Sequence, residues 1–211
     1  MKKIGIIIPY FGVLPEWFPY FQDTSTYNKE LHWFLFSDHQ IPFERKPNFT
    51  FSLLQKQDFV DLVRKKTGFN VNIDSPYKLC DFKPLFGKIF EDFLKGFDFW
   101  GYSDVDMIYG NVSRFITNEL FKKYDIISTY HGYLSGPFSL FRNCEAINTL
   151  HKNIYDIENI LADPNHYGID ENNNTRHHHI SWPRKCMMPF TFIPEFFKSE
   201  PTAKTSMNVS C

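Results

Sequence analysis

The sequence predicts an α/β fold in which helices flank a mostly parallel central sheet. The main observation is that short apolar segments, typical of buried strands, alternate with segments of helical periodicity. A second observation is the length of 211 residues, which suits one domain with a sizeable core. A third is the aromatic content of 18%, from which we expect a core packed with rings.

Five segments have the composition of strands. Residues 2–10 form a continuous β-branched run that ends at a proline, which is typical of a buried parallel strand. The other four are rich in aromatic and branched residues and are bounded by polar or small ones: 31–38, 97–106, 124–129 and 136–143.

Four segments are predicted as helices. The clearest is 81–96, where apolar residues recur at i, i+3 and i+4, Pro84 falls in the first turn and Gly96 ends the segment. The others are an irregular helix over 13–28, a helix over 52–68 that stops at Gly68, and one long helix over 145–161.

The domain organisation follows from where this periodicity ends. We expect one α/β domain over residues 1–172, followed by an atypical and partly disordered tail over 173–211, which lacks clear periodicity. The net charge is -1 and the pI about 6.7, so no long-range field attracts nucleic acid. Nucleic-acid binding is therefore not expected.

The cysteines and the first residues bear on localisation. No two of the four cysteines have CxxC spacing, which argues against a zinc ribbon or a redox motif. Residues 1–12 are too short and too soon interrupted by Pro9 and Gly12 for a signal peptide or a membrane span, and no other segment approaches spanning length. We expect a cytoplasmic protein with reduced thiols and no transmembrane segment, with peripheral contact to the inner face of the membrane left open.

Polar or flexible residues follow three of the predicted strands. These are Pro9 to Gly12, Ser37 with Asp38, and Asp104 with Asp106. In open parallel sheets, ligands bind beyond the carboxyl ends of the strands. The three strand ends are therefore expected to line one crevice.

Asp104 and Asp106 are the first candidate metal ligands. Residues i and i+2 of an extended segment point to the same side, so two carboxylates can hold a hard cation such as Mn²⁺ or Mg²⁺ there. Such a metal could neutralise a diphosphate leaving group. The alternative is a turn with two solvated aspartates, because D-x-D alone is a weak signal. The buried aromatic strand directly before the pair and Gly110 after it favour the metal site.

Three further groups carry a functional and an ordinary interpretation. Asp81 and Lys83 begin the clearest helix, where they could form a phosphate site. The alternative is that Asp81 only caps the helix and that Lys83 is exposed to solvent. The glycines and serine at 132, 135 and 136 allow close approach by a ligand, or only a turn. His131 beside them could orient a hydroxyl or ligate a metal.

The last group lies near the end of the predicted domain. Asp170 and Glu171 are a candidate base or acceptor-binding pair, with a solvated acidic turn as the alternative. His177, His178 and His179 could supply a nitrogen ligand, but three consecutive residues cannot all face one site in a regular element. A surface histidine run is therefore favoured.

Five segments in order resemble a family of bacterial polysaccharide-associated, glycosyltransferase-like proteins with the GT-A fold of nucleotide-sugar transferases. They are IGIIIPYFG, WFLFSD, SPYKLCDFKPLFGKIF, FDFWGYSDVDMIYGNV and SGPFSLFRN. The most specific parts are YKLCDFKP and WGYSDVDMIYGN, and the resemblance covers roughly residues 2–171. It implies that residues 1–172 are a nucleotide-sugar-binding catalytic domain. Beyond them the sequence departs from the family, and the C-terminal part is expected to be shortened.

The resemblance also implies roles for single residues. Asp106 would ligate Mn²⁺ or Mg²⁺ on the diphosphate, and Asp104 would bind that metal through water or contact the ribose. The remaining roles are base and ribose binding by Tyr10, Phe11 and Asp38, sugar or phosphate contact by Asp81 and Lys83, an acceptor border at Gly136, and a catalytic acidic pair at Asp170 and Glu171.

The function expected from these observations is metal-dependent transfer of a hexose-type sugar from a nucleotide donor, a UDP-sugar, to a glycan or lipid-linked glycan in surface polysaccharide synthesis. The alternative is an inactive module that binds a nucleotide-sugar or a glycan, with Asp170 and Glu171 pointing away from the cleft. A nucleotidyltransferase is less favoured, because it would carry a glycine-rich basic loop after the first strand, and residues 9–17 hold one glycine and no basic residue.

Overall fold

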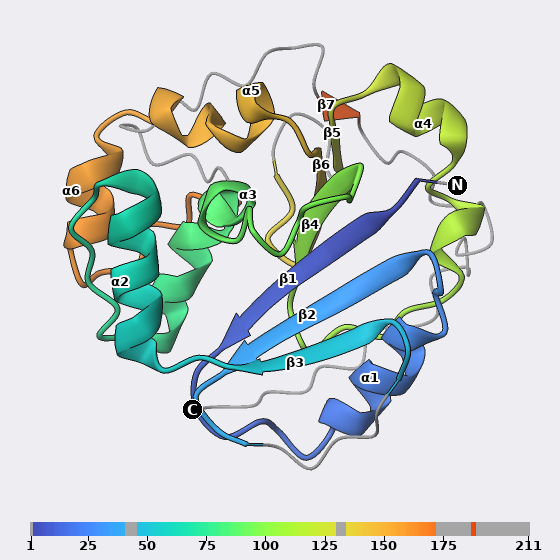
Figure 1. Cartoon of the computed structure of the whole chain (residues 1–211), viewed down its shortest axis with the longest axis horizontal. Helices are drawn as coiled ribbons and strands as arrows, with labels where there is room; N and C mark the ends of the chain where they lie inside the picture. The colour runs from blue at the N-terminus through green and yellow to red at the C-terminus, as the bar shows by residue number, and fades with distance from the viewer. Residues whose placement is uncertain (1, 41–45, 130–133, 172–186, 189–211) are drawn as a thin grey trace, which may run out of the picture.

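The computed structural model describes residues 2–40, 46–129, 134–171 and 187–188. Within these ranges one seven-stranded sheet has the order β3-β2-β1-β4-β6-β5-β7 (Figure 1). Its strands are β1 Ile4–Tyr10, β2 Leu31–Ser37, β3 Phe49–Leu53, β4 Phe99–Ser103, β5 Ile126–Ser128, β6 Phe138–Arg142 and β7 Met187–Met188. Paired strands are parallel except where β6 pairs with β4 and β5. The predicted class, an α/β domain with a mostly parallel, GT-A-like sheet flanked by helices, is confirmed.

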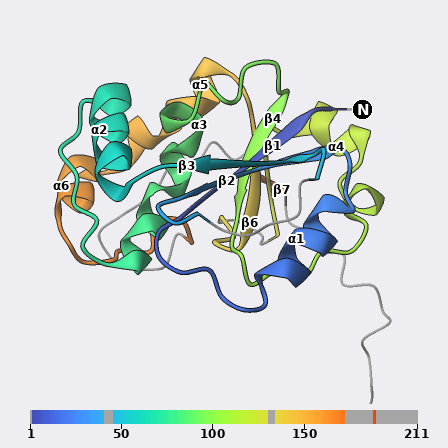
Figure 2. The same ribbon diagram turned by 60° about the horizontal axis from the view of Figure 1, so that its bottom comes forward.

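Helices cover both faces of this sheet (Figures 1 and 2). One face packs against α1 Phe18–Thr26 and α4 Asn118–Lys123. The other packs against α2 Lys56–Thr67, α3 Phe86–Ile89, α5 Glu145–Asn148 and α6 Ile157–Ala162. Three 3₁₀ segments complete the described elements: η1 Pro76–Leu85, η2 Val112–Arg114 and η3 Leu150–Asn153.

The central strands are apolar on both sides because both faces are covered. In β1, Ile7 belongs to the core cluster under α2 and α3, whereas Ile6 and Ile8 belong to the cluster under α1. This alternation follows from the two-residue period of a strand. It explains why β1 is a continuous apolar run rather than an alternating one.

The predicted helix over 81–96 is mostly not α-helical. Residues 76–85 form the 3₁₀ segment η1, only Phe86–Ile89 are α-helical, and turns lead to Gly96, which ends the segment with φ +84°. Pro84 lies inside the segment, lacks an N–H and disfavours an α conformation before it. The apolar spacing was therefore correct for burial but not for helix type.

The other three helix predictions were also too long. In the segment 13–28 only Phe18–Thr26 form the helix α1. The segment 145–161 divides into α5, η3 and α6, and Asp156 has φ +58°, a left-handed conformation that no α-helix can continue. In the segment 52–68, the helix begins only at Lys56, because Ser52 and Leu53 finish strand β3, which pairs with β2. The sequence analysis missed β3.

The sheet extends beyond the expected domain boundary at residue 172. Met187 and Met188 pair with Ile126 and Ile127 of β5. The rest of the tail over 173–211 lies outside the described residues. Among the helices in the described ranges, none combines the length and the apolar character needed to cross a membrane.

Gly87→Ala is expected to destabilise the fold. A Cβ atom at Gly87 would lie 2.3–2.5 Å from three ring atoms of Trp100. The ring has no room to move, because it stacks on Phe141 with 4.3 Å between centroids and donates to Asn148 Oδ1 at 2.7 Å. We expect the free energy of unfolding to fall by an amount at the upper end of the range typical of overpacking, about 1–3 kcal/mol. Urea unfolding would measure it, with Gly110→Ala as a control because its Cβ meets no atom within 4 Å. Equal stability of the two variants would contradict this account of the core.

Candidate functional site

A cleft with a volume of about 500 Å³ opens at the carboxyl ends of β1 and β4. Its walls come from the end of β1 with the loop that follows, from η1, and from residues 103–106 after β4. Seven of the residues singled out in the sequence line it: Pro9, Tyr10, Phe11, Gly12, Lys83, Asp104 and Asp106. The ends of β1 and β4 therefore share one crevice as predicted, whereas Ser37 and Asp38 at the end of β2, which were expected to line it too, do not.

Asp38, at the end of the neighbouring strand β2, supports the cleft without lining it. Its Oδ1 accepts a hydrogen bond from the Gly12 N–H at 2.7 Å and lies 2.7 Å from His39 Nδ1. Gly12 has φ +109°, which favours glycine at this turn. Burial acts to raise the pKa of Asp38, but these two contacts outweigh it and lower that pKa. Asp38 therefore fixes the loop that carries Tyr10 and Phe11.

The loop that bears Asp104 and Asp106 is anchored at its start. The Asp104 N–H donates to the Pro137 carbonyl at 3.1 Å, and Ser103 Oγ donates to the Asp104 carbonyl at 2.7 Å. Tyr109 OH lies 2.6 Å from Ser103 Oγ. Since the Ser103 proton is already used, the Tyr109 hydroxyl is the donor in that pair. The loop thus closes back on the end of β4.

Asn28 anchors the other end of this loop. Its Nδ2 donates to the Gly110 carbonyl at 3.0 Å, and its Oδ1 accepts from the Val112 N–H at 2.8 Å. The side chain is buried, so both contacts are shielded from water. The roles of Asn28, Ser103 and Tyr109 were not predicted, and for Asn28 the reason is that a contact over 82 residues leaves no local pattern.

Lys83 lies at the centre of the polar groups. Its Nζ is 2.8 Å from Asp104 Oδ1, 2.9 Å from Asp170 Oδ2 and 2.8 Å from the Gly136 carbonyl. An ammonium has three N–H donors, so these contacts use all of them. Lys83 therefore joins the loop after β4 to the start of β6 and to the acidic pair.

The electrostatics of this cluster are dominated by carboxylates. Burial lowers the pKa of Lys83, but the charges of Asp170 and Asp104 outweigh it, so that pKa is raised and the side chain stays an ammonium. Burial raises the pKa of Asp104 and of Asp170, and Lys83 only partly offsets it. The charge of Glu171 also raises the pKa of both carboxyl groups.

The two members of the acidic pair lie in different surroundings. Asp170 is 3% exposed and held by Lys83, whereas Glu171 is exposed and makes no side-chain hydrogen bond or ion pair with any described residue. Gly136 is needed beside them, since a Cβ there would lie 2.5 Å from Glu171 Oε1 and 3.0 Å from Asp170 Oδ2. The structure therefore brings Gly136, Asp170 and Glu171 together next to Asp104.

Gly136, Asp170 and Glu171 do not themselves line the cleft but lie beside Lys83 and Asp104, whereas Asp81 forms no hydrogen bond or ion pair with any of these residues. Its side chain is fully buried against Lys78 and against the backbone of residues 167–169. Ser135 is also buried, and it exchanges hydrogen bonds with Ser139. His131, Gly132 and the three histidines 177–179 lie outside the described residues.

The metal prediction depends on Asp104 and Asp106. In the described part of the chain, no three His, Cys, Asp or Glu side chains form a group that could hold a metal ion. Mn²⁺ and Mg²⁺ are commonly held by one or two carboxylates together with substrate phosphates, so a complete protein cage is not required. Asp106 is exposed and unpaired toward the described residues, and Lys83 engages only one oxygen of Asp104. The residues present fit such a metal.

The rim of the cleft carries two exposed aromatic side chains that the sequence analysis did not single out. Trp17, just before α1, is 53% exposed, and Tyr77, in η1, is 74% exposed. The Tyr77 ring lies 6.2 Å from the His166 ring. Aromatic faces of this kind can stack on nucleobases or sugars.

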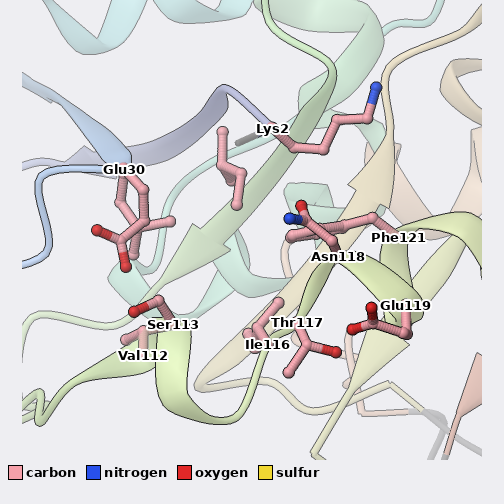
Figure 3. A pocket seen from close by; sticks show the side chains of 11 residues that line it. Lys2, Glu30, Val112, Ser113, Ile116, Thr117, Asn118, Glu119 and Phe121 are labelled. Carbon is pink, nitrogen blue, oxygen red and sulfur yellow. The ribbon is translucent and has the colours of Figure 1, made fainter.

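A second pocket, of about 240 Å³, lies at the opposite ends of the strands, near the starts of β1 and β2. Figure 3 shows Glu30 at one side of it, Lys2 at another, and Asn118 and Glu119 from α4. Lys2 is paired with Asp98 at 2.7 Å. This pocket has no convergent cluster comparable to the one at Lys83, so the cleft at the carboxyl ends is the stronger candidate site.

Fold and site together define a class: an α/β domain with an acidic cleft at the carboxyl ends of its parallel strands. Residues 6–189 match the model of a family of unknown function, DUF6625, and the chain belongs to that family. A comparison with curated proteins gives no match.

Proposed function

We propose that this protein is a metal-dependent glycosyltransferase that moves a sugar from a nucleoside diphosphate donor, a UDP-sugar, to a glycan acceptor. The observation that carries the proposal is the position of Lys83, which joins Asp104 of the D-x-D pair to Asp170 of the acidic pair at one cleft. Transfer of a sugar with inversion at the anomeric carbon needs both halves: a site for the diphosphate and a carboxylate that can receive the acceptor proton.

The charges of the cleft explain why a metal would be needed. Asp104 and Asp106 line the cleft, Asp170 and Glu171 lie next to these residues, and among the described residues that line the cleft Lys83 is the only basic one. Its three donors are already used within the protein. A diphosphate would therefore meet net negative charge. A divalent ion held by Asp104 and Asp106 would neutralise the diphosphate and stabilise the leaving group.

The other candidate residues would bind the nucleoside and the acceptor. Tyr10 and Phe11 would contact the nucleoside, because they line the cleft on the loop that Asp38 fixes. Glu171 is better suited than Asp170 to take the acceptor proton, since Asp170 is buried against Lys83 and Glu171 is free toward the described residues. Gly136, which would border the acceptor, lies beside that carboxylate.

The runner-up is an inactive module that binds a nucleotide-sugar or a glycan. That interpretation expected Asp170 and Glu171 to point away from the cleft around Asp106. Instead, Asp170 shares Lys83 with Asp104, and Glu171 is close enough to affect the pKa of Asp104. This arrangement favours the enzyme. Lipid-linked glycans and surface polysaccharides are the acceptors to be tested within the proposal.

The test is UDP release from a panel of UDP-hexoses in Mn²⁺, with and without glycan acceptors. A transferase should release UDP slowly by hydrolysis of one donor, and faster when its acceptor is added. Tight binding of UDP without release from any donor would instead support the inactive module. Failure to bind and to release would overturn both interpretations.

A further inference from the structure

The buried pair Lys78–Asp81 has no role in the proposed function, because its contacts lie outside the cleft. The two side chains are fully buried, and Lys78 Nζ lies 3.0 Å from Asp81 Oδ2. A buried ion pair commonly contributes no more stability than apolar side chains of similar volume would. Its contacts therefore point to a role other than stability alone.

Both members of the pair bind one segment of backbone far along the chain. Asp81 accepts hydrogen bonds from the N–H groups of Tyr167 at 3.0 Å, Gly168 at 2.8 Å and Ile169 at 3.3 Å. Lys78 Nζ donates to the carbonyl groups of Ile160 and Asn165, each at 2.6 Å. Residues 163–169 lie outside the helices and strands, so for them these bonds replace those of a helix or a sheet, while the bond to Ile160 holds the last turn of α6.

The segment held in this way ends at the acidic pair. Asp170 and Glu171 follow directly, and the Glu171 N–H donates to the Gly168 carbonyl at 3.1 Å. The Asp170 side chain is held by Lys83, which is also part of η1. One short 3₁₀ segment thus fixes both the backbone before the acidic pair and one of its side chains.

We propose that Lys78 and Asp81 are positioning residues that set the place of Asp170 and Glu171 relative to the D-x-D loop. The inference rests on the proposed function. The D-x-D loop, which bears Asp104 and Asp106, has anchors at Ser103, Tyr109 and Asn28 that do not contact the pair, in addition to the contact of Lys83 with Asp104. Loosening the pair should therefore displace the acidic residues and leave the diphosphate site intact.

The test compares Asp81→Asn with Glu158→Gln, a control on the neighbouring helix α6 whose exposed carboxylate makes no hydrogen bond or ion pair with any described residue. Asp81→Asn should lower kcat for UDP release about 100-fold, the cost of misplacing a catalytic group by about 1 Å. Its Kd for UDP with Mn²⁺ should change less than about threefold, because the diphosphate site has separate anchors. Hydrogen exchange in 163–171 should accelerate about tenfold or more, and that of β1 and β4 should not. The control should match the wild type in all three.

If the pair served folding in general, Asp81→Asn would lower UDP binding and turnover together, and that result would overturn the proposal. Unchanged hydrogen exchange in 163–171 would overturn it too, as would full turnover despite faster exchange there. If Asp81→Asn does not fold, the same measurements are made on the double variant Lys78→Met with Asp81→Asn, in which no unpaired ammonium is left buried. A wild type that turns over no donor would overturn the proposed function and the catalytic part of this inference. The exchange data would then still decide whether the pair holds the segment.

Discussion

Replacing Lys83 by methionine is expected to lower the free energy of unfolding by about 3–5 kcal/mol at pH 7, the usual cost of removing one partner from a buried ion pair. Methionine keeps the length of the side chain but provides no N–H donor. Asp104 Oδ1, Asp170 Oδ2 and the Gly136 carbonyl would each lose their contact with Nζ. Asp170 is buried, so its charge would be left without compensation.

The loss of stability in Lys83→Met should depend on pH, and the two carboxyl groups determine whether it grows or shrinks as the pH rises. Folding raises the pKa of Asp104 and of Asp170, so the folded state binds their protons more tightly than the unfolded state does. Their contribution to stability therefore falls as pH rises through the folded pKa values. Without Lys83 these pKa values rise further, and the deficit of Lys83→Met should be smaller at pH 5 than at pH 7.

Denaturant unfolding at both pH values would measure this effect. Lys95→Met is the control, because Lys95 forms an ion pair with Asp92 at 2.8 Å but is largely exposed, and such pairs contribute little. It should unfold like the wild type at either pH. A Lys83→Met variant that matches the control, or whose deficit does not change with pH, would contradict the central place of Lys83.

Glu171→Gln is expected to slow sugar transfer by about 10²–10⁴-fold, the usual contribution of a general base. Glutamine has nearly the same shape but cannot accept the acceptor proton. Binding of UDP with Mn²⁺ should stay within about twofold, because Asp104 and Asp106 are unchanged and a lost base affects the reaction step rather than ground-state binding.

Parallel measurement of kcat and Kd separates these effects. Glu158→Gln serves as the matched control, since Glu158 is an exposed acid on α6 that does not line the cleft. A Glu171→Gln variant with wild-type kcat would exclude Glu171 as the base. Equal losses in binding and turnover would indicate a structural role instead.

The parts that the sequence predicted correctly depend on local patterns. The strands β1, β2, β4, β5 and β6 fall within predicted segments because burial on both faces leaves continuous apolar and aromatic runs. Parallel strands end at one edge, so the cleft could be predicted from Tyr10, Phe11, Asp104 and Asp106.

The parts that failed depend on contacts between distant residues. Asp81 begins an apolar stretch with helical spacing, and this position predicted a phosphate site, but its partners are backbone groups 86–88 residues away. The three contacts of Lys83 come from three separate segments, and no periodicity encodes them. Helix lengths failed for a local reason, since a proline at 84 and a left-handed residue at 156 outweigh an apolar pattern that mainly reports burial.

The most direct test of the proposed diphosphate site is a calorimetric titration with UDP in the presence and absence of Mn²⁺, on the wild type and on Asp106→Ala. Asp61→Ala, an exposed aspartate on α2, is the control. We expect UDP to bind only with Mn²⁺ and its affinity to fall about 100-fold or more in Asp106→Ala. Loss of a residue that hydrogen-bonds to a metal ligand costs roughly 10–100-fold in metal affinity, and loss of the ligand itself should cost at least as much. Binding that needs neither Mn²⁺ nor Asp106, or no binding under any condition, would contradict the metal–diphosphate site and with it the proposed transferase.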